Sequence, residues 1–254
     1  MNSRELLNKW LQKKGYRVER TMPIVLQKQV NFEADLDFLI RYELFRDQEN
    51  FFFVQVGAND GVSRDDDLIK YVKSYNARGI LVEPQPDLFV SLKENFSSYT
   101  SVQLVNKAIH ATEKSMALYR FDLKKLEGIN NLPLWALTNG IASFDKSHVL
   151  DHAKRLGFGE ELICEGQVPC VTLTELLNDY VVVPNILKID TEGYDYEIIK
   201  TLDLTGDVPA IIYFEHLHMS DDEYEDIISQ LAVVGYRFVA DKLNTIAFLD
   251  KGIR

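Results

Sequence analysis

Acidic side chains stand at the ends of three apolar runs in this sequence. The run GILVE ends in Glu83, NILKID ends in Asp190, and AIIYFE ends in Glu215. Glu192 follows Asp190 by two residues, and His216 follows Glu215 directly. Carboxylates accept hydrogen bonds from hydroxyl groups, and a carboxylate or a histidine can take a proton as a general base. These residue types therefore predict a site that binds a polar small molecule and moves a proton.

A glycine loop follows an earlier apolar run, in FFFVQVGANDG at residues 51–61. Gly57 and Gly61 allow the backbone to approach a ligand closely. The dinucleotide pattern G-x-G-x-x-G is not matched, because Asn59 and Val62 occupy its later glycine positions, and no Gly-Lys-Ser/Thr follows for a P-loop. The loop favours a ligand without phosphates at this position, with an ordinary strand-to-helix turn as the alternative.

The acid that ends the second run supports a ligand at this loop. Glu83 lies 26 residues after Gly57, where a strand-end carboxylate can accept two hydrogen bonds from a ribose diol. Pro84 stops the strand, and Pro86 opens the next helix. The alternative for Glu83 is a solvated charge before a loop.

The later strand ends carry the candidate catalytic groups. Asp190 and Glu192 are expected where a substrate meets the cofactor, unless they serve only to cap and decorate the following helix. His216 is a candidate base, whereas a plain surface role is the better interpretation of His218. Glu-His-x-His lacks the spacing of the known zinc-hydrolase motifs, so no metal is expected.

The elements that must position these residues alternate between strand and helix from Phe51 onward. This alternation is typical of an α/β fold with a mostly parallel sheet, covered by helices on both faces. The last two runs, YRFVAD and TIAFLD, are separated only by KLN and predict an antiparallel hairpin. The strand-end residues are therefore expected to meet at one edge of the sheet.

Two segments depart from this alternation. Residues 1–48 contain amphipathic patterns at 3–14 and 31–47, which predict a helical N-terminal extension before a main domain at 49–254. Residues 121–170 lack clear periodicity and predict an irregular insertion. Such an insertion could form a lid that binds the acceptor.

Composition limits the partners. The 254 residues are 46% hydrophobic, and 39 acidic against 28 basic side chains give a formal charge of -11, which argues against nucleic acid. Cys164 and Cys170 lack zinc-site spacing and predict free thiols. No stretch approaches about 20 apolar residues and no signal peptide is recognisable, so the prediction is a cytoplasmic protein without a membrane span. A homo-oligomer formed through the N-terminal helices is left open.

With these motifs the sequence resembles the FkbM family of S-adenosylmethionine-dependent methyltransferases. The resemblance rests on VQVGANDG, VEPQP, VNKAIH and LKIDTEGYDYEIIK, in this order over about residues 50–216. It implies a Rossmann-like class I methyltransferase fold, with a seven-stranded sheet of order 3-2-1-4-5-7-6 and an antiparallel seventh strand.

The resemblance also implies site residues, with S-adenosyl-L-methionine as the cofactor. The glycine loop would line its methionine part, Glu83 its ribose, and residues 106–108 its adenine. Gln55 stands where members commonly carry an acid, so Asp60 or Asp190 would supply that charge. The predicted cofactor-binding residues are Gln55, Gly57, Ala58, Asn59, Asp60, Gly61, Glu83, Pro84, Asn106, Lys107, Ala108 and Asp190. The predicted catalytic residues are Asp190, His216 and Glu192.

The expected activity is O-methylation of a hydroxyl on a sugar, glycan or related small acceptor. A sulfonium methyl is already activated, so the protein chiefly aligns the acceptor oxygen and excludes water, with Asp190 or His216 as base. Trp135 could offer its ring to a sugar. The alternatives are a nicotinamide-dependent oxidoreductase and a non-catalytic protein that keeps the cofactor fold for binding a partner.

Overall fold

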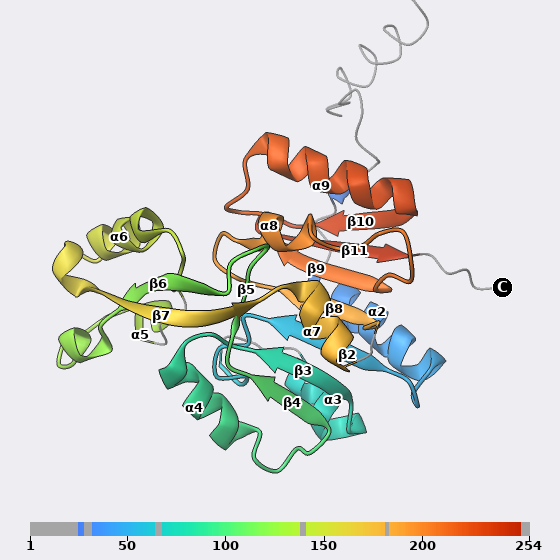
Figure 1. The fold of residues 1–254 in the computed structure, drawn as a ribbon, viewed down its shortest axis with the longest axis horizontal. Helices are drawn as coiled ribbons and strands as arrows, with labels where there is room; N and C mark the ends of the chain where they lie inside the picture. Colours follow the sequence, from blue (N-terminus) through green and yellow to red (C-terminus); the bar gives the residue numbers. More distant parts are fainter. Residues whose placement is uncertain (1–24, 28–31, 64–67, 138–140, 181–182, 250–254) are drawn as a thin grey trace, which may run out of the picture.

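The computed structural model describes residues 25–27, 32–63, 68–137, 141–180 and 183–249. A large sheet of eight strands forms the centre, and a small sheet of three strands projects from one side of it (Figure 1). The amphipathic helix predicted at 3–14 lies outside the described residues.

The large sheet has the order β1-β10-β11-β9-β8-β2-β3-β4. Its strands pair in parallel, except that β11 is antiparallel to both β10 and β9. Read from β4, the first seven strands follow the predicted order 3-2-1-4-5-7-6, so the predicted topology and its terminal hairpin are confirmed. The strands are β1 (Val25–Gln27), β2 (Phe52–Val56), β3 (Arg78–Val82), β4 (Val102–Val105), β8 (Ile186–Ile189), β9 (Ile211–Glu215), β10 (Tyr236–Ala240) and β11 (Asn244–Leu249).

Helices cover both faces of this sheet, with α7 in front of it and α3 behind it in Figure 1. Val54 belongs to one core and its neighbour Phe53 to the other, because successive side chains of a strand point to opposite faces. The core of Val54 includes α7 (Leu173–Tyr180), α8 (Asp195–Ile199) and α9 (Asp221–Val234). The core of Phe53 includes α2 (Phe32–Arg46), α3 (Leu68–Tyr75) and α4 (Pro86–Asn95). Within the described ranges, no helix has both the length and the apolar character needed to cross a bilayer.

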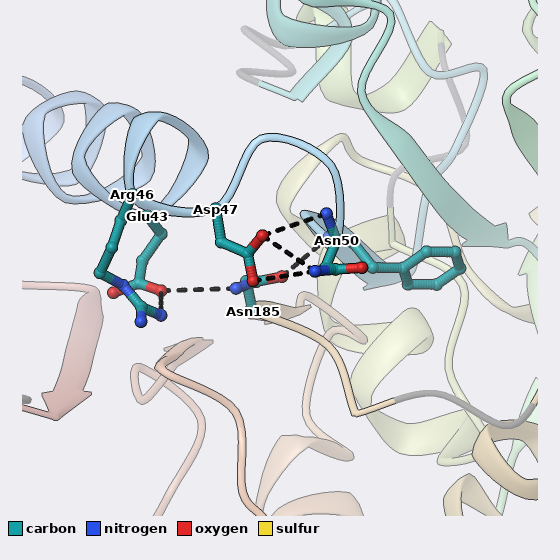
Figure 2. Close-up of polar contacts among 6 residues, drawn as sticks. Glu43, Arg46, Asp47, Asn50 and Asn185 are labelled. Carbon is teal, nitrogen blue, oxygen red and sulfur yellow. Dashed lines mark hydrogen bonds and ion pairs between the residues drawn. The ribbon is translucent and has the colours of Figure 1, made fainter.

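A polar cluster fastens α2 to the amino-terminal edge of the sheet (Figure 2). Glu43, only 3% exposed, accepts a hydrogen bond from Arg46 at 2.5 Å and another from the Asn185 amide at 3.4 Å. The Asn185 side-chain oxygen accepts from the backbone N–H of Phe52 at 2.8 Å. These contacts tie the helix to the beginnings of β2 and β8, at the edge opposite the predicted site.

The N-terminal extension is not purely helical. Helix α2 agrees with the pattern at 31–47, but β1 pairs in parallel with β10 at the edge of the large sheet. Three residues are too few to show a strand periodicity in the sequence. The exposed backbone groups of the β10 edge provide the pairing that forms this strand.

The segment at 121–170 is not irregular, so that prediction is wrong. It contains α5 (Leu134–Leu137), α6 (Lys146–Arg155), two 3-10 helices (Leu123–Leu126 and Glu160–Leu162) and most of β7 (Ile163–Val171). Strand β7 pairs antiparallel with all of β6 (Ser115–Phe121) and in parallel with β5 (Ala108–Ile109).

Strand β7 was not predicted from the sequence because Gly166 and Pro169 lower its strand propensity. Long-range pairing with β6 overrides that local preference, and buried residues such as Phe121 and Val149 form a separate core where α6 packs against β6 and β7. Cys164, also on β7, is a free thiol, as predicted.

Candidate functional site

The carboxyl ends of the central strands form a polar edge on one face of the large sheet. On the face that carries Phe53, Gln55 of β2 lies beside Lys188 of β8, which lies beside Tyr213 of β9. The opposite face stays apolar to the strand ends, as at Val56. The same strands thus support a hydrophobic core with their first residues and a polar surface with their last.

A cavity of about 280 Å³ lies over this polar edge. Its volume is close to the roughly 300 Å³ at which small-molecule pockets begin. Ten of the fourteen predicted site residues line it, and these are Gln55, Gly57, Ala58, Asn59, Glu83, Pro84, Lys107, Ala108, Asp190 and Glu192. The fold therefore brings together residues that are spread over 138 positions of the sequence, from 55 to 192.

Two residues of the glycine loop lie outside the cavity lining. Asp60 accepts hydrogen bonds from the backbone N–H and the hydroxyl of Ser63, at 2.8 and 2.6 Å. Gly61 packs beneath α4, where an added Cβ would lie 2.4 Å from the ring of Phe96. Both residues shape the loop rather than face the cavity.

Asn106 and His216 also lie outside the lining. The Asn106 amide donates to the carbonyl oxygen of Glu83 at 2.8 Å, so it holds the end of β3 in place. His216 Nδ1 is 3.0 Å from the Thr245 hydroxyl, and its ring lies against Tyr224 of α9. Neither side chain is directed at the cavity in the way the sequence suggested.

Glu83 presents a buried carboxylate to the cavity. Its two oxygens accept hydrogen bonds from the backbone N–H groups of Asn59 and Gln85, each at 2.8 Å. Burial raises the pKa of Glu83 to about 7, and the nearby Asp190 carboxylate adds to the rise. Each carboxylate oxygen has a second lone pair, so Glu83 can orient the glycine loop and still accept from a ligand.

Gly57 allows β2 and β8 to approach each other at their ends. Its φ is +82°, and an added Cβ would lie 1.8 Å from the carbonyl oxygen of Asp190. The Asp190 N–H in turn donates to the carbonyl of Val56 at 3.0 Å. Glycine is therefore required here to close the site, independently of any ligand.

The turn after β8 is strained and anchored. Glu192 has a φ of +53°, a left-handed conformation that costs a non-glycine residue about 1 kcal/mol. Asp195, only 2% exposed, accepts from the Thr191 N–H at 3.1 Å and from the Glu215 N–H at 3.0 Å. Burial raises the pKa of Asp195 to about 6. Asp195 thus fixes the Glu192 turn against the end of β9.

Sequence reasoning missed Asp195 and Lys188 as site residues. An acid at the start of a helix, shortly after the strand-end acid Asp190, is a signal that could have identified Asp195. Lys188 lies two residues before Asp190, so strand alternation places both on the same face, and Lys188 also lines the cavity.

Three side chains from distant parts of the chain meet beside this turn. They are His148 of α6, Glu192 and His218, and one ligand atom of each lies within 4.8 Å of the others. His218 Nε2 is 3.9 Å from a Glu192 oxygen and 3.6 Å from a Glu215 oxygen. Burial lowers the pKa of His148 and of His218, which favours the neutral form of both rings. His218 therefore belongs to a cluster with Glu192, which lines the cavity, although His218 itself does not.

Aromatic rings form another wall of the cavity. Phe144 and Tyr194 both line it, with ring centroids 5.2 Å apart, and His110 stacks on Tyr194 at 5.1 Å. Trp135 instead packs toward Phe121, at 6.4 Å, and is not part of the lining. The rings that line the cavity are therefore those of Phe144 and Tyr194, not the Trp135 ring proposed from the sequence.

Comparisons with known proteins bear on the chemistry. A family model described as a methyltransferase FkbM domain matches residues 55–238. A precorrin-6y C5,15-methyltransferase from Geobacter metallireducens GS-15 is 14% identical over 89% of this chain and 92% of that chain, with a TM-score of 0.41. The SAH-bound Podospora anserina methyltransferase PaMTH1 is 10% identical over 98% and 97%, with a TM-score of 0.40. These scores are too low to support an argument about function. A search of curated proteins found no match.

Proposed function

Because the chain belongs to the FkbM family of S-adenosylmethionine-dependent methyltransferases, we propose that it methylates a hydroxyl oxygen of a sugar or related small acceptor. Methyl transfer and the cofactor follow from the family. The acceptor class and the oxygen specificity are the proposal, and the composition of the cavity supports them.

The residues of the cavity fit this cofactor. Strand order puts Glu83 and Lys107 on one side of Gly57, and Asp190 on the other. The buried Glu83 carboxylate suits a ribose diol, because it accepts hydrogen bonds from both hydroxyl groups. A 2′-phosphate in their place would be repelled by the carboxylate. Bound S-adenosylmethionine supplies a methyl group already activated on a sulfonium.

The observation that carries the proposal is the group of carboxylates on the β8–β9 side of the cavity. Asp190, Glu192 and Glu215 all line that side. Carboxylates accept hydrogen bonds from the hydroxyl groups of a polyol, and one of them can take the proton that the reacting hydroxyl loses. Phe144 and Tyr194 add apolar ring faces, which suit the C–H face of a sugar.

Asp190 is the proposed base. It accepts the hydroxyl proton while the acceptor oxygen forms its bond to the methyl carbon, and the electron pair of the broken carbon–sulfur bond stays on sulfur. Asp190 lines the cavity, whereas His216 does not, so the base role falls to Asp190. The residues that line the cavity hold the acceptor oxygen in line with the methyl carbon, and the rate of transfer depends on this orientation.

Titration calorimetry with S-adenosylhomocysteine tests the cofactor site. The folded wild-type protein should bind it, and Glu83→Ala should bind at least about tenfold more weakly, as expected for losing a hydrogen bond to a charged acceptor. Absence of binding by the folded wild type, or equal binding by the variant, would contradict the assignment of Glu83.

Mass spectrometry of a set of acceptors tests the oxygen specificity. Incubation with S-adenosylmethionine should add one methyl group to sugar hydroxyls and none to matched amino sugars acetylated at oxygen. Methylation confined to nitrogen or to RNA would refute the acceptor class. Cofactor binding without any turnover, together with a stable protein complex, would favour the non-catalytic alternative, and the family match disfavours the nicotinamide alternative.

A further inference from the structure

Two histidines that do not themselves line the cavity meet Glu192, which does. His148 comes from α6, Glu192 from the turn after β8, and His218 from the segment after β9. One potential ligand atom of each residue lies within 4.8 Å of the other two. We propose that these three side chains bind a divalent transition-metal ion.

The donor set matches transition metals rather than magnesium or calcium. Two imidazoles and one carboxylate, with a position left for substrate, is the ligand set of several catalytic zinc and iron sites, whereas magnesium and calcium prefer oxygen ligands. Ligand atoms around a tetrahedral zinc ion, with bonds of about 2.0–2.1 Å, are about 3.4 Å apart. The ligand atoms therefore need to approach one another by at most about 1.4 Å, which side-chain rotation can provide.

The protein holds these ligands in place before any metal binds. Glu192 is kept in its left-handed turn by the contacts of Asp195, and backbone strain of this kind is typical of functional positions. His148 Nε2 is buried, and no described residue hydrogen-bonds to it. A buried polar atom without a partner costs about 1–3 kcal/mol, and coordination would offset such a cost.

Glu215 lies within reach of the same ion. One of its oxygens is 3.6 Å from His218 Nε2, and Glu215 also lines the cavity. The carboxylates of Glu192, Glu215 and Asp190 together offset the repulsion between a metal cation and a nearby sulfonium. This charge balance explains how one cavity can accommodate both cations.

The role of the metal rests on the proposed O-methylation, although metal binding itself does not. An ion held here would coordinate an acceptor oxygen, lower the pKa of its hydroxyl and fix its direction. Asp190 would then accept the proton from a more acidic group. The ion would also favour acceptors with two neighbouring hydroxyls, which can bind it together.

Cobalt provides a spectroscopic probe of this site. Protein freed of metal by a chelator is titrated with Co²⁺, whose visible absorption reports nitrogen and oxygen ligation, and Zn²⁺ is then added as a competitor. One equivalent of Co²⁺ should bind and be displaced by Zn²⁺. His148→Ala, Glu192→Gln and His218→Ala should each weaken binding at least about tenfold.

His216→Gln is the matched control, because His216 lies two residues from His218 but faces Thr245. It should bind Co²⁺ as the wild type does. Absent binding, binding unaffected by the three ligand substitutions, or equal loss in His216→Gln would overturn the proposal. Circular dichroism melts identify any variant that fails to fold, and His148→Asn and His218→Asn then replace the alanine variants.

S-adenosylhomocysteine titrations on the same samples separate this proposal from the proposed function. Cofactor binding without Co²⁺ binding would reject the metal site and leave the methyltransferase assignment intact. Co²⁺ binding without cofactor binding would support the metal site and contradict the proposed function.

Discussion

Two edges of the large sheet, formed by the amino-terminal and by the carboxyl-terminal ends of its strands, place carboxylates in different surroundings. At the amino-terminal edge, Glu43 is paired with the guanidinium of Arg46 and the amide of Asn185 (Figure 2). At the carboxyl edge, the Glu83 carboxylate accepts hydrogen bonds from the backbone N–H groups of Asn59 and Gln85, and the charge that adds to the rise in its pKa is another carboxylate, Asp190.

This difference separates a structural use of acidic residues from a binding use. Raising the pKa of Glu83 from 4.5 to about 7 corresponds to about 3 kcal/mol at 1.36 kcal/mol per unit. The fold tolerates this cost at the edge where parallel strands present their carboxyl ends to a ligand. At the amino-terminal edge, Glu43 is instead matched within the chain by Arg46 and Asn185.

The largest expected effect comes from breaking the carboxyl edge at Gly57. Gly57→Ala would place Cβ against the Asp190 carbonyl, so we expect a loss of more than about 3 kcal/mol of unfolding free energy and no cofactor binding. Gly128→Ala is the control, because Gly128 has a similar φ of +81° but no heavy atom of a described residue lies within 4 Å of an added Cβ. It should cost about 1 kcal/mol. Urea unfolding measures both, and equal losses would contradict the close approach of β2 and β8.

The ionisation of Glu83 should make cofactor affinity depend on pH. Hydroxyl donors bind the ionised form, so affinity for S-adenosylhomocysteine should rise up to about 100-fold between pH 5 and pH 8 and then level off. The same raised pKa stabilises the free protein below pH 4.5, and this contribution is lost as pH rises through 7. Calorimetry across this range checks the profile. A flat profile, or an unchanged one in Glu83→Gln, would contradict the assignment.

Substitutions at the two edges should have separable effects. Glu43→Ala should lower the unfolding free energy by about 1–3 kcal/mol, because it leaves Arg46 and Asn185 without their acceptor, and should not alter cofactor affinity. Glu83→Gln should weaken cofactor binding by roughly ten- to a hundredfold. Chemical unfolding and calorimetry on both variants make the comparison. It fails if Glu43→Ala weakens cofactor binding as much as Glu83→Gln does.

The smallest effect is expected at the strained turn. Glu192→Gly relieves the left-handed strain and should raise the unfolding free energy by about 0.5–1 kcal/mol, while abolishing the proposed Co²⁺ binding. Asn131→Gly is the control, since asparagine adopts its φ of +65° readily and little strain is removed. Thermal unfolding measures the pair. Destabilisation by Glu192→Gly would show that the side chain is structural.

Local sequence patterns were sufficient to predict the central strands of the large sheet but not the small sheet. The runs ending at Glu83 and Asp190 are apolar and bounded by turns, so their strands could be predicted, as could the terminal hairpin, whereas the strand order came from the family resemblance. Strand β7 contains Gly166 and Pro169 and forms only by pairing with β6, and β1 forms only at the edge of β10. Contacts between distant segments leave no periodicity for sequence reasoning to detect.

The sequence by itself determined the family, the cofactor and the strand ends that would meet, because these depend on short motifs whose residues lie at fixed places relative to each strand. Tertiary structure alone decided that Asp195 anchors the Glu192 turn, that Phe144 rather than Trp135 lines the cavity, and that His148 joins His218. The reason is physical. Side chains from separate elements are brought together by the packing of those elements, and no local spacing encodes that packing.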